Sequence, residues 1–269
     1  MLCEKTERRE KRLMAYNYLY WLLIVSAFSL ILELILPWAK KTYLVREYSQ
    51  DVFWLFFNGW IFGFLIRPLS EYLSSSFLYV PIISSLYSER YLLSGLSFIY
   101  QLILLLIVKD LIEYWVHRFL HANRWLWHIH KLHHSIKEMY WIGNFRFHWL
   151  EIVIYNAAKF IPLIMLGVHW KAVFVCSVFS TFIGHLNHTN VKMDYGILKY
   201  ILNSPSLHIW HHDRENHYRN GQNFAIVLSL WDWIFGTIYY KKHEYPEALG
   251  FAGDELYSGS VTKRFLCLS

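Results

Sequence analysis

One histidine pattern, His-x-x-His-His, occurs twice in this chain, as "HKLHH" at residues 130–134 and as "HIWHH" at residues 208–212. In each copy the three histidines occupy positions i, i+3 and i+4. Residues with this spacing lie on one side of an α-helix, because about 3.6 residues make one turn. The pattern therefore predicts two helices that each direct three imidazoles to one side. It favours a helical fold in which those two sides meet.

Two shorter patterns extend the series, "HRFLH" with histidines one helical turn apart and "HLNH" with histidines at i and i+3. Thirteen of the fifteen histidines lie between residues 117 and 212, so chance does not explain their concentration. His128, His169 and His243 stand outside the patterns, and we expect them to be polar caps or packing residues. The ten patterned histidines are predicted to converge on a common centre: His117, His121, His130, His133, His134, His185, His188, His208, His211 and His212.

Ten imidazoles are more than one metal ion can bind, since a single ion takes about three to six ligands. They suit two ions with about five ligands each. Imidazole is a ligand for Fe, Zn, Cu and Ni. The three cysteines are widely separated and form no Cys-x-x-Cys pair, which argues against a thiolate site and a disulfide framework. Asp110 lies seven residues before His117 on the same helical stripe and is expected to accept a hydrogen bond from a ligand ring.

Long apolar runs surround the histidine patterns. The chain is 55% hydrophobic and 17% charged, whereas ordinary soluble domains are about a quarter charged. Its mean hydropathy of +0.23 is modest for a protein made mostly of membrane helix. Tyr91–Val108 contains no charged residue and predicts a transmembrane helix. The remaining runs cover residues 19–36, 52–66, 77–86 (short, with Pro81 inside it), 152–168 and 172–184, and the last two predict a helical hairpin turning at "HWK".

These runs predict an all-α integral membrane protein with about four to five transmembrane or re-entrant helices and a histidine-rich helical cap at the membrane surface. The net charge of +6 could indicate nucleic-acid binding. However, the basic residues flank apolar segments and no nucleic-acid motif occurs, so attraction to anionic lipid is the simpler interpretation. The N-terminal segment does not resemble a cleaved signal peptide, and its basic residues predict a cytoplasmic N-terminus. We also predict that the histidine patterns face the cytoplasm.

The order of these patterns resembles the membrane fatty acid hydroxylase and sterol desaturase superfamily. "DLIEYWVHRFLH" and "WHIHKLHHS" are similar to its first two motifs, and "HTNV", "SPSLHIWHH" and "NFAIVLSLWDWIFGT" to later ones. "FRFHWLE" resembles the family's Arg-x-His-Pro-x-Glu element, with Trp149 in place of the proline. The family's usual Asn-Tyr-Gly turn is replaced by residues 222–224. The resemblance covers about residues 110–240 and implies catalytic roles for His148 and Glu151, with Asp110 in support.

The resemblance implies a non-heme oxygenase with two Fe ions, which Zn can replace in purified protein, and with O2 as co-substrate. The reaction expected from the family is hydroxylation of a C–H bond of a fatty acyl, sterol or sphingolipid-type lipid, with desaturation as the alternative. No cytochrome-like segment is present at either end, so we expect a separate electron donor of the ferredoxin or cytochrome b5 type, with its reductase. The implied domains are membrane segments at 1–90, a hydroxylase-like catalytic domain at 91–240 and a polar tail at 241–269.

Other protein classes fit the sequence less well. A metal transporter would carry its ligands at mid-membrane depth, yet the apolar runs are almost free of His, Asp and Glu. A bis-histidine heme protein needs facing pairs of histidines instead of ten imidazoles at turn spacing. A catalytically inactive scaffold would not need intact patterns.

Overall fold

The computed structural model describes residues 2–39, 45–58, 93, 95–165, 168–257 and 260–265. Within these ranges the chain is helical and its only β-type pairings are isolated bridges, which confirms the all-α prediction. The predicted run at 77–86 and most of the run at 52–66 lie outside the described residues. The elements in chain order are α1 (Leu2–Ile35), α2 (Val45–Phe56), α5 (Phe98–Ala122), α6 (Arg124–His134), η2 (Trp141–Phe145), α7 (Trp149–Met165), α8 (Trp170–His188), η3 (Gly196–Tyr200), α9 (Pro205–His211), α10 (Leu230–Ile234), η4 (Asp254–Leu256) and α11 (Val261–Phe265).

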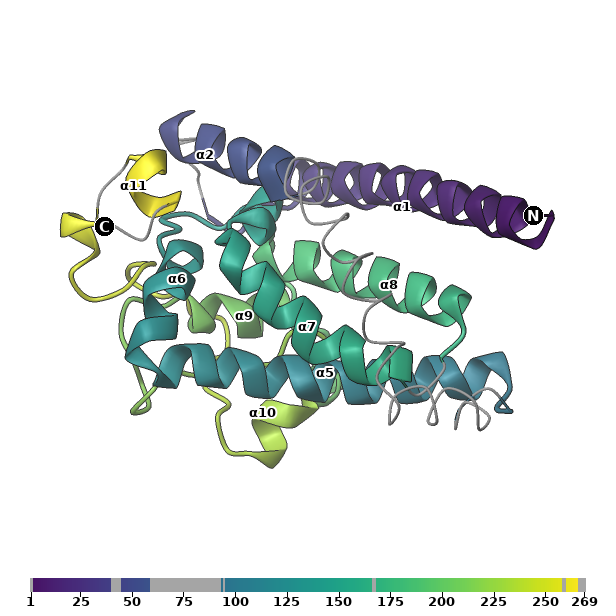
Figure 1. Ribbon diagram of the computed structural model, residues 1–269. Coiled ribbons are helices and arrows are strands. Elements are labelled where there is room, and N and C mark those ends of the chain that lie inside the picture. Colours follow the sequence, from purple (N-terminus) through teal and green to yellow (C-terminus); the bar gives the residue numbers. More distant parts are fainter. Residues whose placement is uncertain are drawn as a thin grey trace.

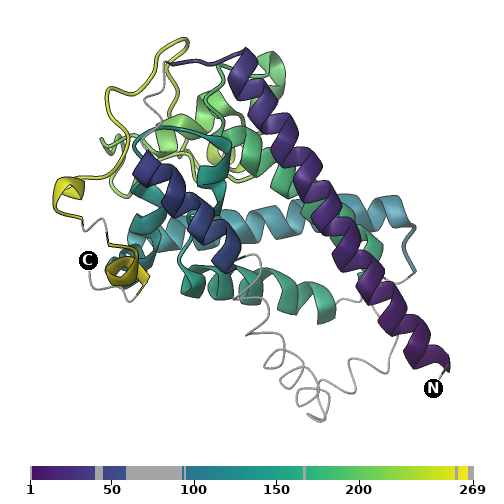
Figure 2. The ribbon, with the colours of Figure 1, turned by 90° about the horizontal axis from the view of Figure 1, so that it is seen from above.

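Four long helices form the body of the molecule (Figure 1). The α7–α8 hairpin packs on α5, and α1 packs on α8. Seen from above, α1 crosses the bundle at an angle to α5 (Figure 2). The two helices run in opposite directions, as the predicted hairpin requires; α7 ends at Met165 and α8 begins at Trp170, within the predicted "HWK" segment. His169 caps α8, because its Nδ1 accepts a hydrogen bond from the backbone N–H of Lys171 (3.2 Å).

α1, α5 and α8 all run toward the same end of the bundle, where α6 and α9 lie, and α7 runs away from it (Figure 1). The break between α5 and α6 has a local cause. The Asn123 side chain accepts hydrogen bonds from the backbone N–H groups of Trp125 and Leu126, and it is therefore the N-cap of α6. Consequently "HRFLH" lies at the end of α5, and "HKLHH" forms the last five residues of α6.

The predicted span at 91–108 is displaced in the structure. The helix begins at Phe98 and continues to Ala122, so that it includes Lys109, Asp110 and Glu113. These charged residues interrupt its apolar character. Among the described residues, α1 is the one helix that is long and apolar enough to cross a membrane, over Tyr18–Ile35.

Glu33 is the acidic residue inside the apolar run of α1, and it is 4% exposed. Its carboxylate accepts hydrogen bonds from the backbone N–H groups of Trp141 (2.7 Å) and Asn190 (3.1 Å). A buried carboxylate with two such donors is satisfied. Glu33 therefore connects α1 to the start of η2 and to the segment that follows α8.

The chain beyond residue 241 packs against this end of the bundle. Leu249 is buried in a core cluster with Trp210, and the Asp254 carboxylate forms an ion pair with Lys137. The buried Arg264 of α11 donates a hydrogen bond to Gln50 of α2. This predicted polar tail is thus part of the folded body, and the proposed domain boundaries stay a prediction.

Candidate metal centre

Nine of the ten patterned histidines converge at the end of the bundle formed by α5, α6, α8 and α9. Their ring nitrogens form two groups, and within each group the ligand atoms lie within 4.8 Å of one another. The five-histidine group contains His117, His121, His130, His134 and His211. The four-histidine group contains His133, His188, His208 and His212. All nine side chains are buried except that of His121, which is partly exposed.

Each His-x-x-His-His pattern contributes to both groups, and the two patterns do so in opposite ways. In α6 the i and i+4 histidines belong to the five-histidine group and the i+3 residue, His133, belongs to the other. In α9 the i+3 residue, His211, joins the five-histidine group and its two companions join the four-histidine group. The groups are adjacent, since the ring centroids of His134 and His212 are 4.8 Å apart.

Unprotonated ring nitrogens face one another across the five-histidine group. His117 Nδ1 donates to the carbonyl oxygen of Phe224 (2.7 Å), and His130 Nδ1 donates to Glu151 Oε1 (2.7 Å). In each neutral ring the Nε2 atom must then carry a lone pair. These two Nε2 atoms are 3.1 Å apart, as are those of His130 and His121. Two facing lone pairs repel each other unless a cation lies between them.

The same logic holds in the four-histidine group. His188 Nδ1 donates to the carbonyl oxygen of Gly184 (2.9 Å), which leaves its Nε2 as an acceptor. That Nε2 is 3.3 Å from the Nε2 atoms of both His133 and His208. The Nε2 atoms of His211 and His212 are buried, and neither has a hydrogen-bond partner among the described residues.

This arrangement fits bound metal ions. Fe or Zn bonds to imidazole nitrogen are about 2.0–2.1 Å long, so neighbouring ligand nitrogens around one ion are about 2.9–3.4 Å apart. The observed separations of 3.1 and 3.3 Å fall in that interval. Orphaned ring nitrogens and fixed tautomers are what a metal site requires, because neutral imidazole is the ligand form.

Burial keeps these rings neutral. Loss of solvation lowers the pKa of His117 to about 4. The pKa of His134 is also lowered well below its usual range, first by burial and then by neighbouring rings such as His211 and His121. The charged imidazolium form is therefore disfavoured in the folded state.

We expect metal-free protein, prepared with a chelator, to melt at a lower temperature at about pH 5 than at about pH 7.5. Above about pH 6.5 the rings are neutral in both states. As pH falls below that value, the unfolded chain binds protons that the folded chain does not, so folding loses free energy. For His117 alone the full loss is about 3 kcal/mol, reached near pH 4. Fluorescence-detected melting in detergent measures it, and an unchanged melting temperature would contradict the assignment.

His185, the tenth patterned histidine, lies outside both groups. Its Nε2 contacts the Ser26 hydroxyl of α1 (3.1 Å), and its Nδ1 accepts from the Asn144 amide (3.0 Å). The expectation of ten converging ligands was therefore wrong at this position. The i and i+3 spacing of His185 and His188 put both on one side of α8, but His185 is one turn too far from the centre.

Asp110 makes no contact with a ligand ring, in contrast to the sequence prediction. Its carboxylate accepts hydrogen bonds from the backbone N–H groups of Val227 (2.9 Å) and Leu228 (2.7 Å) and from the Trp231 indole (3.0 Å). Asp110 instead holds the segment that follows Phe224, whose carbonyl orients His117. Asp110 therefore affects the position of His117 indirectly, through the backbone of residues 224–228.

His148 and Glu151 occupy the start of α7. His148 Nδ1 accepts from the backbone N–H of Leu150, which caps the helix, and His148 Nε2 donates to the carbonyl oxygen of Phe265. Glu151 contacts His130 through one oxygen, and its other oxygen is buried without a partner among the described residues. The catalytic roles of both residues stay predictions.

Residues 222–224 were not predicted to serve the site, yet their backbone orients two ligands. The carbonyl oxygen of Gln222 accepts from His211 Nδ1 (2.8 Å) and that of Phe224 accepts from His117. Asp232 fixes this segment by accepting from the backbone N–H of Phe224 (2.8 Å). Gly221 precedes it with φ +95°, and a Cβ there would lie 3.2 Å from the His121 ring.

A model of the family described as "Fatty acid hydroxylase" matches residues 102–237, half of the chain. The chain belongs to the fatty acid hydroxylase family. This confirms the resemblance of the histidine motifs. The matched segment contains every member of both histidine groups and ends near the close of α10.

Several relatives share the hydroxylase segment. Ornithine lipid hydroxylase OlsE of Rhizobium tropici is 32% identical over 170 residues, which cover 62% of this chain and 48% of the relative. Alkylglycerol monooxygenase of Homo sapiens is 36% identical over 129 residues (46% and 27%). Methylsterol monooxygenase 1-3 of Arabidopsis thaliana is 26% identical over 149 residues (54% and 50%). The chain thus spans half or less of the length of these relatives. No solved structure matches it.

Proposed function

We propose that this protein is a membrane-bound non-heme di-iron oxygenase that hydroxylates a C–H bond of a lipid with O2. The observation that carries the proposal is the pair of adjacent, buried imidazole groups in the fold of a fatty acid hydroxylase family member. The names of the relatives support the lipid substrate, since each describes a hydroxylase or monooxygenase of a lipid.

The two histidine groups would hold one iron ion each. Bound iron would supply the oxidising power: one oxygen atom of O2 enters the C–H bond, and the other leaves as water with two electrons and two protons from a donor. Zn would bind the same nitrogen ligands in purified protein. The four-histidine group offers one ligand fewer than its neighbour, which suits an ion that keeps a position for a co-substrate.

The surrounding residues orient the ligands and exclude water. Glu151 fixes the ring and tautomer of His130, as carboxylates do beside metal-bound histidines. The Phe147 ring stacks on that of His133, with ring centroids 4.5 Å apart and planes 8° apart. This aromatic cover limits water beside the four-histidine group.

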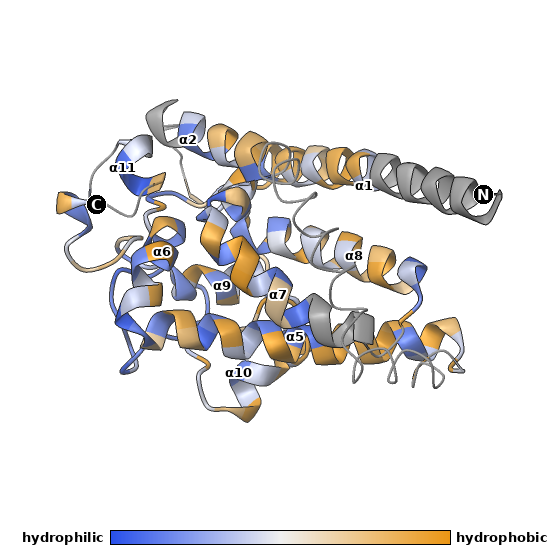
Figure 3. Cartoon of the chain, in the orientation of Figure 1, coloured by the Kyte–Doolittle hydropathy of each residue, from blue (hydrophilic) through white to orange (hydrophobic). Residues whose placement is uncertain are grey.

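We propose that the bundle lies in the membrane with its histidine-bearing end at the surface, and that four to five segments span or re-enter it. Large apolar side chains are exposed along α1, including Leu23, Ile31 and Leu34, and along the first half of α5, including Ile99 and Ile103. Figure 3 shows hydrophobic residues along these helices and hydrophilic residues around α6 and α9. Exposed apolar surface of this extent favours contact with lipid.

The histidine end is proposed to face the cytoplasm, where a separate reductase system can reach it. The N-terminal end of α1 lies at the opposite end of the bundle (Figure 1). If α1 crosses the membrane once, its basic N-terminal turns and the histidines are on opposite sides. The two sequence predictions of a cytoplasmic N-terminus and cytoplasmic histidines therefore conflict, and labelling of Cys3 in intact cells distinguishes them.

The electron donor is proposed to be a separate ferredoxin-type or cytochrome b5-type protein with its reductase. A cavity of about 300 Å³ reaches His121, His134 and His211 of the five-histidine group. Its lining also includes the side chains of Arg124, Arg214 and Arg219. Asp213 also lines it, and Arg214 is paired with Glu255, so two arginines besides this pair give the rim a positive excess that favours an acidic donor over a basic one.

Lipid analysis tests the proposed reaction. Cells that express the protein are expected to accumulate a lipid heavier by one oxygen atom than its precursor in control cells, as measured by mass spectrometry of total lipid extracts. A lipid lighter by two hydrogens would indicate desaturation instead. Unchanged lipids together with iron-free protein, even after growth with added iron, would overturn the proposal.

A further inference from the structure

A cavity of about 610 Å³ lies between α1, α5, α7 and α8. Its wall is mainly apolar, with aromatic rings such as Phe145, Phe147 and Phe174, and a group of polar side chains of α5, α7 and α8 lies within it. Ligand pockets generally measure about 300–1,000 Å³, so this cavity has room for a lipid head with several carbons of its chain. No member of the two histidine groups is among its described lining residues.

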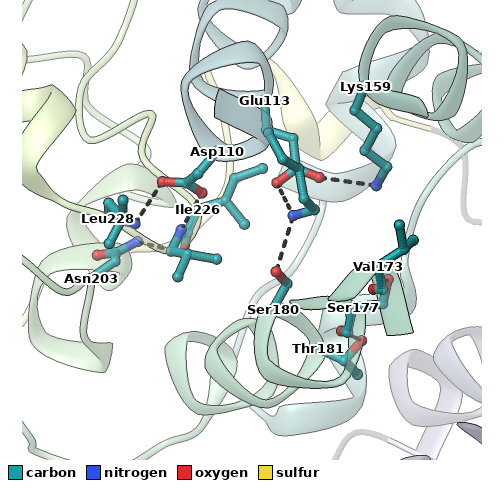
Figure 4. Close-up of polar contacts among 12 residues, drawn as sticks. Asp110, Glu113, Lys159, Val173, Ser177, Ser180, Thr181, Asn203, Ile226 and Leu228 are labelled. Carbon is teal, nitrogen blue, oxygen red and sulfur yellow. Dashed lines mark hydrogen bonds and ion pairs between the residues drawn. The ribbon is translucent and has the colours of Figure 1, made fainter. Parts of the chain in front are cut away.

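Three charged side chains meet in the cavity wall (Figure 4). Lys109 Nζ donates to Glu113 Oε2 (2.6 Å) and to the Ser180 hydroxyl (3.0 Å). Lys159 Nζ donates to Glu113 Oε1 (2.9 Å). Both oxygens of the carboxylate are therefore bound by ammonium groups. Asp110 is directed away from this cluster, toward Leu228 (Figure 4).

The cavity wall offers hydrogen-bond donors to a ligand. An ammonium group has three N–H donors, and Lys109 uses two of them on Glu113 and Ser180. The hydroxyl of Tyr155 also lines the cavity and makes no hydrogen bond to a described residue. A ligand that brings oxygen acceptors, above all anionic ones, satisfies these groups, whereas a hydrocarbon end leaves them unpaired.

The cavity extends from this polar cluster to the four-histidine group. Phe147, which lines it, stacks on His133. Gly184, also in the wall, accepts a hydrogen bond from His188. Along α7, Glu151, Tyr155 and Lys159 follow one another at intervals of one helical turn. The lysine is therefore about 12 Å along the helix from the glutamate that contacts His130.

We propose that this cavity holds the polar end of the lipid substrate, and that Lys109 and Lys159 bind a carboxylate or phosphate group of that lipid. The inference rests on the proposed oxygenase function and narrows its substrate to an anionic lipid. Because Lys159 is about 12 Å along α7 from Glu151, which contacts His130, we expect the oxidised carbon to lie closer to the anchored group than to the far end of a long acyl chain.

Binding to purified protein in detergent tests the anchor. The probes are palmitate, hexadecyl phosphate and methyl palmitate, which have similar hydrocarbon chains but head groups of different charge. Quenching of the protein's tryptophan fluorescence measures the affinity for each probe. The wild-type protein is expected to bind at least one anionic probe about tenfold more tightly than the ester. Whichever anion binds more tightly identifies the head group as a carboxylate or a phosphate.

Lys159→Gln is expected to remove most of that preference without weakening binding of the ester, because Glu113 keeps its bond to Lys109. Lys159→Arg restores the charge and should restore the preference. Lys242→Gln, a change at an exposed lysine, is the matched control. Equal affinity of wild-type protein for all three probes, or a preference that survives Lys159→Gln, overturns the anchor. This binding assay does not require iron. A failure of the oxygenase proposal is therefore detected separately, by metal and lipid analysis.

Discussion

The variants His211→Ala and His133→Ala are each expected to retain about one metal ion per chain, compared with about two in the wild-type protein, and to form no detectable product. His211 belongs to the five-histidine group and His133 to the four-histidine group, so each change damages one site. Alanine has no atom that can bind a metal ion, so the affected group loses one ligand nitrogen. The proposed reaction with O2 needs both ions, and activity should therefore fall by about a thousandfold or more in each variant.

Elemental analysis of purified protein measures the metal content, and lipid mass spectrometry measures the product. His128→Ala is the matched control, because His128 is an exposed residue on the same helix as His133. It is expected to keep both ions and full activity. If both ligand variants kept two ions per chain, the two groups would not be separate metal sites.

Glu151→Gln is expected to weaken metal binding at the five-histidine group by about 10- to 100-fold and to lower activity at least in proportion. The Glu151 carboxylate accepts from His130 Nδ1 at 2.7 Å and therefore holds the Nε2 lone pair toward the group. A glutamine at this position can turn its amide toward the ring and favour the other tautomer. The ring would then present an N–H, which cannot bind a metal ion.

Titration of the metal-free protein with Fe²⁺ or Zn²⁺ measures the change in affinity. Glu247→Gln removes an exposed carboxylate and should leave both affinities unchanged. Excess metal ions should restore part of the activity of Glu151→Gln, because only the orientation of one ligand is impaired. Normal affinity combined with lost activity would show that Glu151 acts on the substrate and not on His130.

The helical spacing of the histidines predicted most of the candidate metal centre. Positions i, i+3 and i+4 place three imidazoles on one side of a helix whatever surrounds it, and nine of the ten predicted residues meet. Spacing could not show which of the two groups each ring joins. His133 and His134 are adjacent in the sequence but belong to different groups, because α6 lies between the two sites.

The groups that orient the ligands were less predictable. Carbonyl oxygens of Gln222 and Phe224 fix two rings. Every residue has such an oxygen, so side-chain identity carries no signal for this role. This explains how the segment can differ from the family's usual turn and still serve the site. Asp110 was singled out by its position on α5, yet its partners come from a segment more than one hundred residues away in the sequence.

The sequence by itself determined that the chain is helical, that its histidines share sides of helices and that its family is that of the fatty acid hydroxylases, because these properties depend on local spacing and on motifs. The tertiary structure decided that the ligands divide into five and four, that His185 lies outside both groups and that Lys109 and Lys159 share Glu113 in the wall of a cavity. These features depend on contacts between helices that are distant in the chain. The physical reason is that a helix determines the direction of a side chain, and the packing of its neighbours determines what that side chain meets.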